Sequence, residues 1–216
     1  MKYKLVIFDL DGTLADTSPG ILNCIRYTQK KMNLPEISLE KMYTHIGPPM
    51  AESYNRNFGL TGEMLNQAIG YHKEYAMKQG YKEIKLYDGI VELLDYLKQN
   101  GIVTAVATLK AHSTTLKIFE HLRITNKFDI IKGVDGINPK IKAQLLEECI
   151  EEAKCEKTEC VLIGDSKYDA FGAEKAGIDF IAVTYGFGFK TKDEVGKFSK
   201  IGIANTVKEI YLLLPN

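Results

Sequence analysis

The stretch Leu5-Val6-Ile7-Phe8-Asp9-Leu10-Asp11-Gly12-Thr13 decides how this chain folds. Its first four residues are apolar, and they predict a short buried strand of a parallel sheet. Asp9 and Asp11 follow at the carboxyl end of this strand, where open α/β sheets place their ligand crevice. Two such acids repel each other unless a positive charge, most simply a divalent cation, lies between them. The alternative is an ordinary turn, in which Asp and Gly are common.

Similar apolar runs recur along the chain and alternate with helical patterns. The helix expected at 90–100 shows the rule best, because its apolar residues repeat every three or four positions and Gly101 follows as a C-terminal cap. This alternation predicts an α/β fold: a Rossmann-like parallel sheet with right-handed crossovers and helices on both faces. The further strands are expected at 102–108, 128–132, 160–164 and 179–184, with a weaker one at 201–204.

Residues 17–84 break this alternation, since they contain no strand pattern. We therefore predict an α/β core formed by residues 1–16 and 85–216, with an inserted small α-helical cap at 17–84. Both crossings between the two parts lie near the acidic motif, where they are natural hinges for a lid. The expected helices of the cap are 18–33, 38–45, 49–58 and 62–79.

Composition excludes several classes of function. The chain has 216 residues, 45% of them hydrophobic, and its formal net charge is +0. A neutral chain lacks the basic footprint of a protein that binds nucleic acid or an anionic membrane. No apolar run reaches the ~20 residues of a membrane span, and the first residues lack the pattern of a signal peptide. We expect a cytoplasmic protein with neither a nucleic acid polymer nor a membrane as its partner.

Cysteine and histidine spacing argues against a zinc site. No two cysteines form a Cys-x-x-Cys pair, and no cluster of histidines accompanies them. Unpaired cysteines of this kind fit a reducing cytoplasm. The histidines are scattered, so we expect them at the surface or in supporting positions. These residues are Cys24, Cys149, Cys155 and Cys160, and His45, His72, His112 and His121.

Three further motifs follow the acidic one. Residues 103–110 read Val-Thr-Ala-Val-Ala-Thr-Leu-Lys, an apolar strand that ends in Thr108 and Lys110. Lys140 and Lys142 open a helical segment, and residues 161–169 read Val-Leu-Ile-Gly-Asp-Ser-Lys-Tyr-Asp. These four motifs, in this order, resemble those of the haloacid dehalogenase-like hydrolases, which are mostly phosphatases. The resemblance covers nearly the whole chain and favours the phosphoglycolate phosphatase and 5′-nucleotidase branch, whose members carry a small helical cap.

The resemblance implies a catalytic or binding role for residues of these motifs. Asp9 is the expected nucleophile, which takes the phosphoryl group as an acyl phosphate and so divides hydrolysis into two steps. Asp11 is the expected general acid and base, a function worth ~10²–10⁴-fold in rate. Thr108, at a strand end, is placed to bind a phosphate oxygen, with Lys110 close behind. Gly12, Thr13 and Gly47 are further candidates for binding the substrate.

Acidic residues from three of the motifs are candidate ligands of a cation. Asp9, Asp165 and the backbone carbonyl of Asp11 suit Mg²⁺, which takes a few oxygen ligands and accepts a phosphate oxygen. Asp169 is a further candidate, directly or through water. Its alternative use is as an acid in the first turn of a helix.

The third motif needs a lysine to balance the nucleophile and the transferred group. Lys142 fits the helix-opening pattern of the family best, Lys140 is the second candidate, and Lys132 is a third. Sequence places helix starts only to within a few residues, so the choice between Lys142 and Lys140 stays open here.

Together these residues predict a Mg²⁺-dependent phosphomonoester hydrolase that acts on a small phosphorylated metabolite, as a monomer or homodimer. The alternatives are a phosphosugar mutase of the same family and a non-catalytic protein that binds a phosphorylated metabolite. Gly47-Pro48-Pro49 resembles the cap loop of the phosphatases, and the flanking residues His45, Met50 and Tyr54 are candidates to face the substrate.

Overall fold

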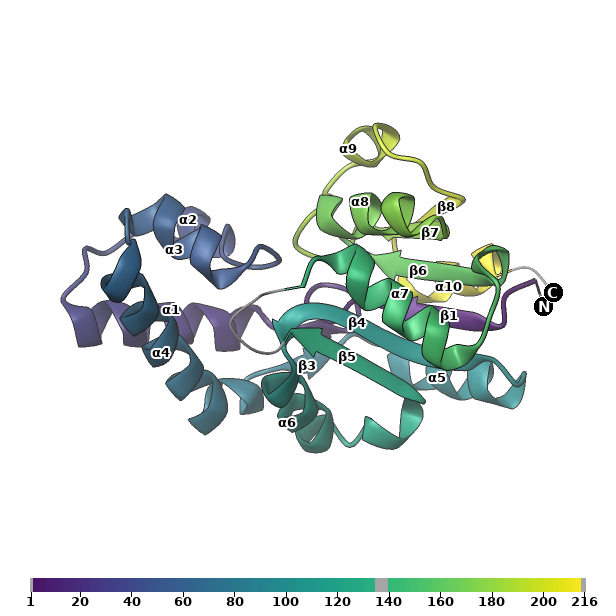
Figure 1. Ribbon diagram of the computed structural model, residues 1–216, viewed down its shortest axis with the longest axis horizontal. Helices are drawn as coiled ribbons and strands as arrows, with labels where there is room; N and C mark the ends of the chain where they lie inside the picture. The colour runs from purple at the N-terminus through teal and green to yellow at the C-terminus, as the bar shows by residue number, and fades with distance from the viewer. Residues whose placement is uncertain (1, 135–139, 215–216) are drawn as a thin grey trace.

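The computed structural model describes residues 2–134 and 140–214. Residues 135–139 and 215–216, which the predicted core range includes, lie outside the described part. The centre of the fold is a six-stranded parallel sheet with the order β5-β4-β1-β6-β7-β8 (Figure 1). These strands are β1 (Leu5–Phe8), β4 (Val103–Ala111), β5 (Ile130–Val134), β6 (Cys160–Gly164), β7 (Asp179–Val183) and β8 (Gly202–Ala204).

The strand order sets where a ligand can bind. Strands β4 and β5 extend the sheet to one side of β1, whereas β6, β7 and β8 extend it to the other. The winding therefore reverses at β1, and in such sheets the ligand crevice lies outside the carboxyl ends of the strands at the reversal. The predicted Rossmann-like α/β architecture is confirmed, and it places Asp9 at the switch point.

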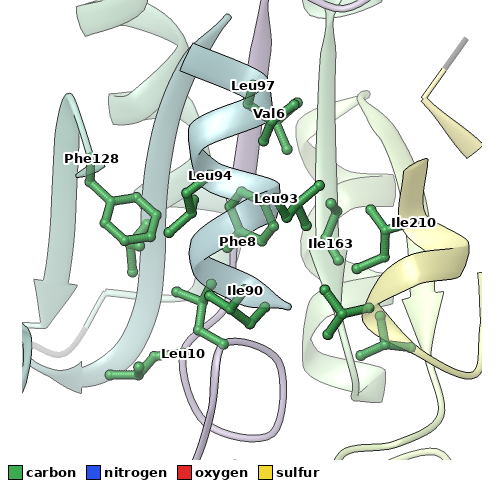
Figure 2. Packing of buried hydrophobic residues seen from close by; sticks show 14 of the residues in the cluster. Val6, Phe8, Leu10, Ile90, Leu93, Leu94, Leu97, Phe128, Ile163 and Ile210 are labelled. Carbon is green, nitrogen blue, oxygen red and sulfur yellow. The ribbon is translucent and has the colours of Figure 1, made fainter. Parts of the chain in front are cut away.

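Helices cover both faces of the sheet because apolar residues of β1 point alternately to each side. Val6 and Phe8 pack with one set of helices, and Leu5 and Ile7 with the other. Figure 2 shows Val6 and Phe8 among leucines of one helix of the first set. The first set is α5 (Ile90–Gln99), α6 (His112–Leu122) and α10 (Val207–Leu213); the second is α7 (Lys142–Ala153), α8 (Lys167–Ala176) and α9 (Lys192–Gly196).

Four helices lie apart from the sheet, at the left of Figure 1. They are α1 (Ser18–Met32), α2 (Leu39–Tyr43), α3 (Met50–Phe58) and α4 (Gly62–Lys78). They pack around small apolar clusters of their own. The chain enters and leaves this group through a short antiparallel pair, β2 (Ala15–Asp16) and β3 (Lys85–Leu86). Single 3₁₀ turns occur at Gly80–Lys82, Thr125–Lys127 and Lys157–Glu159. The exact domain boundaries at 16/17 and 84/85 stay a prediction.

Within the described ranges, no helix combines the length and the apolar character that crossing a membrane requires.

The α5 helix offers a test of the core. Leu93 is fully buried against the sheet, whereas Val91 on the same helix is exposed. Leu93→Ala removes buried methyl groups and leaves a cavity, so we expect it to lower the free energy of unfolding by about 3 kcal/mol. Val91→Ala is the matched control and should change that free energy by about 0.5 kcal/mol at most. Urea unfolding measures both, and equal effects would contradict this packing.

Candidate active site

Three buried carboxylates meet at the carboxyl ends of β1 and β6. Asp9 follows β1, Asp165 follows β6, and Asp169 lies in the first turn of α8. Their side chains bring one oxygen each to within 4.8 Å of the others. All three residues are at least nine-tenths buried. Parallel strands end at the same edge of the sheet, so residues more than 150 positions apart come together here.

Lys142 reaches this group from the first residue of α7. Its Nζ lies 2.6 Å from Asp9 Oδ1 and 2.7 Å from Asp169 Oδ1, and it donates a hydrogen bond of 2.8 Å to the carbonyl of Ala107. The other two candidate lysines are directed elsewhere: Lys140 pairs with Glu148, and Lys132 pairs with Glu152 at 2.6 Å. Of the three, the structure brings only Lys142 to Asp9.

Asp165 is held by the backbone of the loop that follows β7. Its Oδ2 accepts hydrogen bonds from the N–H groups of Phe187, at 2.6 Å, and Gly188, at 2.9 Å. Gly12 lies against the same carboxylate with φ of +83°, and a Cβ added there would come within 2.2 Å of Asp165 Oδ2. Glycine is therefore required at position 12 both for its backbone conformation and for space.

Asp169 contacts the start of its own helix and also belongs to the carboxylate cluster. Its Oδ2 accepts hydrogen bonds from the backbone N–H of Ser166, at 3.0 Å, and from the Ser166 hydroxyl, at 2.6 Å. This arrangement supports the start of α8. Its other oxygen faces Lys142 and the carboxylate group.

The site carries more negative charge than its own lysine balances. Burial raises the pKa of Asp9 to about 7, although the Lys142 ammonium lowers it. Burial, together with Asp169 and Asp9, raises the pKa of Asp165 to about 8. Burial alone would lower the pKa of Lys142, but Asp169 and Asp9 raise it above its ordinary value. Three carboxylates around one ammonium are the donor set and the charge that a hard divalent cation requires.

The Asp11 carboxylate pairs with Lys110. The Lys110 ammonium lies 3.0 Å from the Asp11 carboxylate. The nearby Thr108 hydroxyl accepts a hydrogen bond of 3.3 Å from the backbone N–H of Lys110, so its own proton is available to a ligand. The Asp11 side chain is not part of the three-carboxylate cluster, and its expected metal contact through the backbone carbonyl stays a prediction.

A cavity of about 80 Å³ joins these residues to the helices α1, α3 and α4. Asp9, Asp11, Thr108, Lys110 and Lys142 line one side of it. The opposite side is formed by the helical group and the loop before α3, and includes His45, Gly47, Pro48, Met50 and His72. A second hollow, lined in part by Asp11, Asp165, Gly47 and Phe187, opens beside it.

Two of the expected substrate contacts lie outside both linings. Gly12 packs on Asp165, and Thr13 is fully buried with its carbonyl bonded to the Tyr185 hydroxyl at 2.9 Å. Their contact with a substrate stays a prediction. Tyr54 is likewise fully buried between helices and does not line the cavity.

Sequence reasoning missed His72 as a cavity residue, whereas it named His45 as a candidate to face the substrate. Both are buried and both line the cavity. His72 belongs to α4, and its sequence context gives no sign of this position, because only the packing of α4 on α1 and α3 turns it inward. His45 lies two residues before Gly47, and this closeness to the cap loop was the one available signal.

Comparison with known proteins is consistent with this geometry. A family model described as "Haloacid dehalogenase-like hydrolase" matches residues 6–183. A 5′-nucleotidase of Pseudomonas aeruginosa is 30% identical over 90% of this chain and 88% of its own. The tyrosine-protein kinase PtkA of Mycobacterium tuberculosis is 37% identical over 86% of this chain, which spans 63% of PtkA.

Solved structures of similar fold include a predicted phosphatase. A predicted phosphatase from Clostridium acetobutylicum superposes with a TM-score of 0.89 at 33% identity and covers 97% of both chains. Further relatives carry the names phosphoglycolate phosphatase and pyrophosphatase PpaX.

The close packing of α8 on Lys142 can be tested through a glycine. A Cβ added to Gly172 would come within 2.4 Å of Lys142 Cγ, whereas one added to Gly70 of α4 would meet nothing within 4 Å. We expect Gly172→Ala to lower the free energy of unfolding by about 1–3 kcal/mol through overpacking. Gly70→Ala, the control, should raise it by about 0.5–1 kcal/mol. Urea unfolding distinguishes the two, and a stabilising Gly172→Ala would contradict the contact.

Proposed function

The chain belongs to the haloacid dehalogenase-like hydrolase family and is a phosphatase, and on that premise we propose that it hydrolyses phosphomonoesters through an aspartyl-phosphate intermediate with Mg²⁺. The observation that carries this proposal is Asp9 at the switch point of the sheet, bonded to Lys142 at 2.6 Å. A buried carboxylate fixed by a lysine, with two further carboxylates beside it, suits an attack on an anionic phosphate.

In the first step, the free oxygen of the Asp9 carboxylate attacks phosphorus. Lys142 holds the other oxygen, so the nucleophile is oriented, and its charge is partly balanced as the anionic phosphate approaches. The Thr108 hydroxyl donates a hydrogen bond to a phosphate oxygen. Asp11 protonates the oxygen of the leaving group, which departs as an alcohol.

In the second step, Asp11 removes a proton from water, which attacks the phosphorus of the aspartyl phosphate. Inorganic phosphate leaves and the Asp9 carboxylate is restored. Asp11 suits both steps because its carboxylate lies outside the three-carboxylate cluster and faces the cavity, where Lys110 orients it. Lys110 is also placed to bind a substrate oxygen.

Asp9, Asp165 and Asp169, with the backbone carbonyl of Asp11, are the residues that would hold Mg²⁺. Their buried and mutually repelling carboxylates fit this ion, which takes carboxylate and phosphate oxygens and keeps several waters. When bound, Mg²⁺ neutralises charge on the transferred phosphoryl group. The raised pKa values of Asp9 and Asp165 support this assignment, since a divalent cation supplies the missing positive charge.

The proposed substrate is a small phosphorylated metabolite, as the names of the relatives suggest. Phosphoglycolate and 5′-nucleotides are therefore natural first compounds to assay. A cytoplasmic location is part of the proposal and rests on the four free cysteines.

Replacing the nucleophile tests the reaction. Asp9→Asn keeps the size of the side chain but removes the attacking oxygen, so we expect kcat for p-nitrophenyl phosphate to fall by ~10⁴-fold or more. Asp88→Asn, a change at an exposed position, is the matched control and should keep the wild-type kcat. Circular dichroism verifies that both variants are folded.

The same assay separates the alternatives. Near-wild-type turnover by Asp9→Asn would disprove the nucleophile assignment. A wild-type protein that turns over no phosphate ester, but becomes stably phosphorylated at Asp9, would favour the mutase. Binding without turnover or phosphorylation would favour the non-catalytic protein.

Metal binding has a readout that does not depend on activity. Mg²⁺ at 100 times its Kd should raise the free energy of unfolding by about 2.7 kcal/mol, because it binds only the folded site. Asp165→Asn removes a ligand and should reduce this gain, whereas Asp193→Asn on α9 should not. Thermal unfolding with Mg²⁺, compared with Na⁺ at equal ionic strength, measures the difference. An equal gain in wild type and Asp165→Asn would exclude Asp165 as a ligand.

A further inference from the structure

Tyr54 stands at the centre of a hydrogen-bonded group inside the helical cluster. Its side chain is fully buried, and its hydroxyl lies 3.1 Å from Thr28 Oγ1 and 2.9 Å from His72 Nδ1. The rings of His72 and His45 both pack edge-on against the Tyr54 ring, with centroids 5.8 and 5.2 Å away. Tyr54 therefore braces two histidines that line the cavity.

The direction of these hydrogen bonds fixes the tautomer of His72. The Thr28 hydroxyl donates to the carbonyl of Cys24 at 2.9 Å, so the proton between Thr28 and Tyr54 must come from Tyr54. Tyr54 has then used its only proton, and its oxygen accepts a hydrogen bond from Nδ1–H of His72. A neutral imidazole protonated at Nδ1 carries a lone pair at Nε2.

His72 can offer that lone pair to a ligand. The residue lines the same cavity as Asp11, Thr108 and Lys110. Among the described residues, Nε2 has no hydrogen-bond partner, while Nδ1 is occupied by Tyr54. Because burial and the charge of Lys110 lower the pKa of His72 to about 3, the ring stays neutral near pH 7. It is then a hydrogen-bond acceptor for a hydroxyl group and gives no charge to attract a carboxylate.

His45 adds a second neutral ring that packs against Tyr54. Burial, with Arg56 nearby, lowers the pKa of His45 to about 4. Its Nε2 is buried and has no hydrogen-bond partner within the described residues. Buried polar atoms usually have partners, so such an atom beside the cavity suits contact with a ligand.

Two of the three lysines that line the cavity are paired with carboxylates. Lys142 is engaged with Asp9 and Asp169, and Lys110 with Asp11. The third lining lysine, Lys73, is exposed on α4. The cavity of about 80 Å³ continues beside the second hollow, since Asp11, Gly47 and Pro48 line both.

We propose that His72, oriented by Tyr54 and Thr28, selects the substrate: its Nε2 accepts a hydrogen bond from a hydroxyl group of the leaving group. The favoured substrates are then monophosphates of uncharged polyols or sugars, in preference to a carboxylated ester. This inference rests on the phosphatase function proposed above and specifies its substrate class.

The kinetic test compares esters that differ in the leaving group. The panel is glycerol 3-phosphate, phosphoglycolate, 5′-AMP and p-nitrophenyl phosphate, and wild type should have a higher kcat/KM for glycerol 3-phosphate than for phosphoglycolate. His72→Asn keeps an amide where Nδ1 contacts Tyr54 but removes the acceptor at Nε2. The ratio of kcat/KM for glycerol 3-phosphate to that for p-nitrophenyl phosphate should fall ~10–100-fold. Gln67→Asn, at an exposed position of α4, should leave this ratio unchanged.

The outcomes distinguish this inference from the function on which it rests. Equal losses for all four esters in His72→Asn would overturn the specificity role while leaving the phosphatase function intact. A wild-type preference for phosphoglycolate that disappears in Lys73→Ala would assign recognition to a charge and also overturn it. No turnover of p-nitrophenyl phosphate by wild type would refute the phosphatase function itself.

The tautomer is measured independently of catalysis. Long-range ¹⁵N–¹H NMR of protein labelled in its histidines should show the Nδ1–H form for His72. Tyr54→Phe removes the acceptor at Nδ1 and should shift the population toward Nε2–H. An Nε2–H tautomer in wild type would contradict the orientation by Tyr54.

Discussion

The ion pairs of Lys142 with Asp9 and Asp169 are the interaction on which the site depends. They join the start of α7 to the end of β1 and to the first turn of α8. The partners Lys142 and Asp9 are 133 positions apart in the chain, so the pair forms only when the sheet is assembled. Because the ammonium is buried, it acts at low dielectric, where a lost partner leaves a costly unpaired charge.

The ion pairs of Lys142 in turn depend on the order of the strands in the sheet. The reversal of winding at β1 leaves space at its carboxyl end, and β6 beside it delivers Asp165 to the same edge. A single lysine cannot balance three carboxylates at this edge, so the fold concentrates negative charge at the switch point. Burial and mutual repulsion raise the pKa values of Asp9 and Asp165, which supports the proposal that a cation binds at this site.

The sequence alone was sufficient to place those site residues whose position follows from a local pattern. Asp9 and Asp165 could be placed because each directly follows a recognisable strand, and parallel strands end at one edge. Thr108 was expected at a strand end, but it lies within β4, which continues to Ala111 past a shift in its register with β5. The choice between Lys142 and Lys140 was not local, because it depends on where α7 begins, and Lys140 lies before its first residue. Only the packing of α7 on β4 directs Lys142 to Asp9 and leaves Lys140 to Glu148.

The helical cluster was harder to interpret for a related reason. Its helices were recognisable by period, but His72 becomes a cavity residue only because Tyr54 and Thr28, from two other helices, hold its ring. Polar groups of this kind are specified by three-dimensional contacts, whereas the acids of the core are specified by position along a strand. The residues proposed for the reaction are thus specified locally in the core, and those proposed to select the substrate are specified by packing among the helices α1, α3 and α4. A substrate class is therefore better argued from the hydrogen-bond directions around His72 than from any motif in the chain.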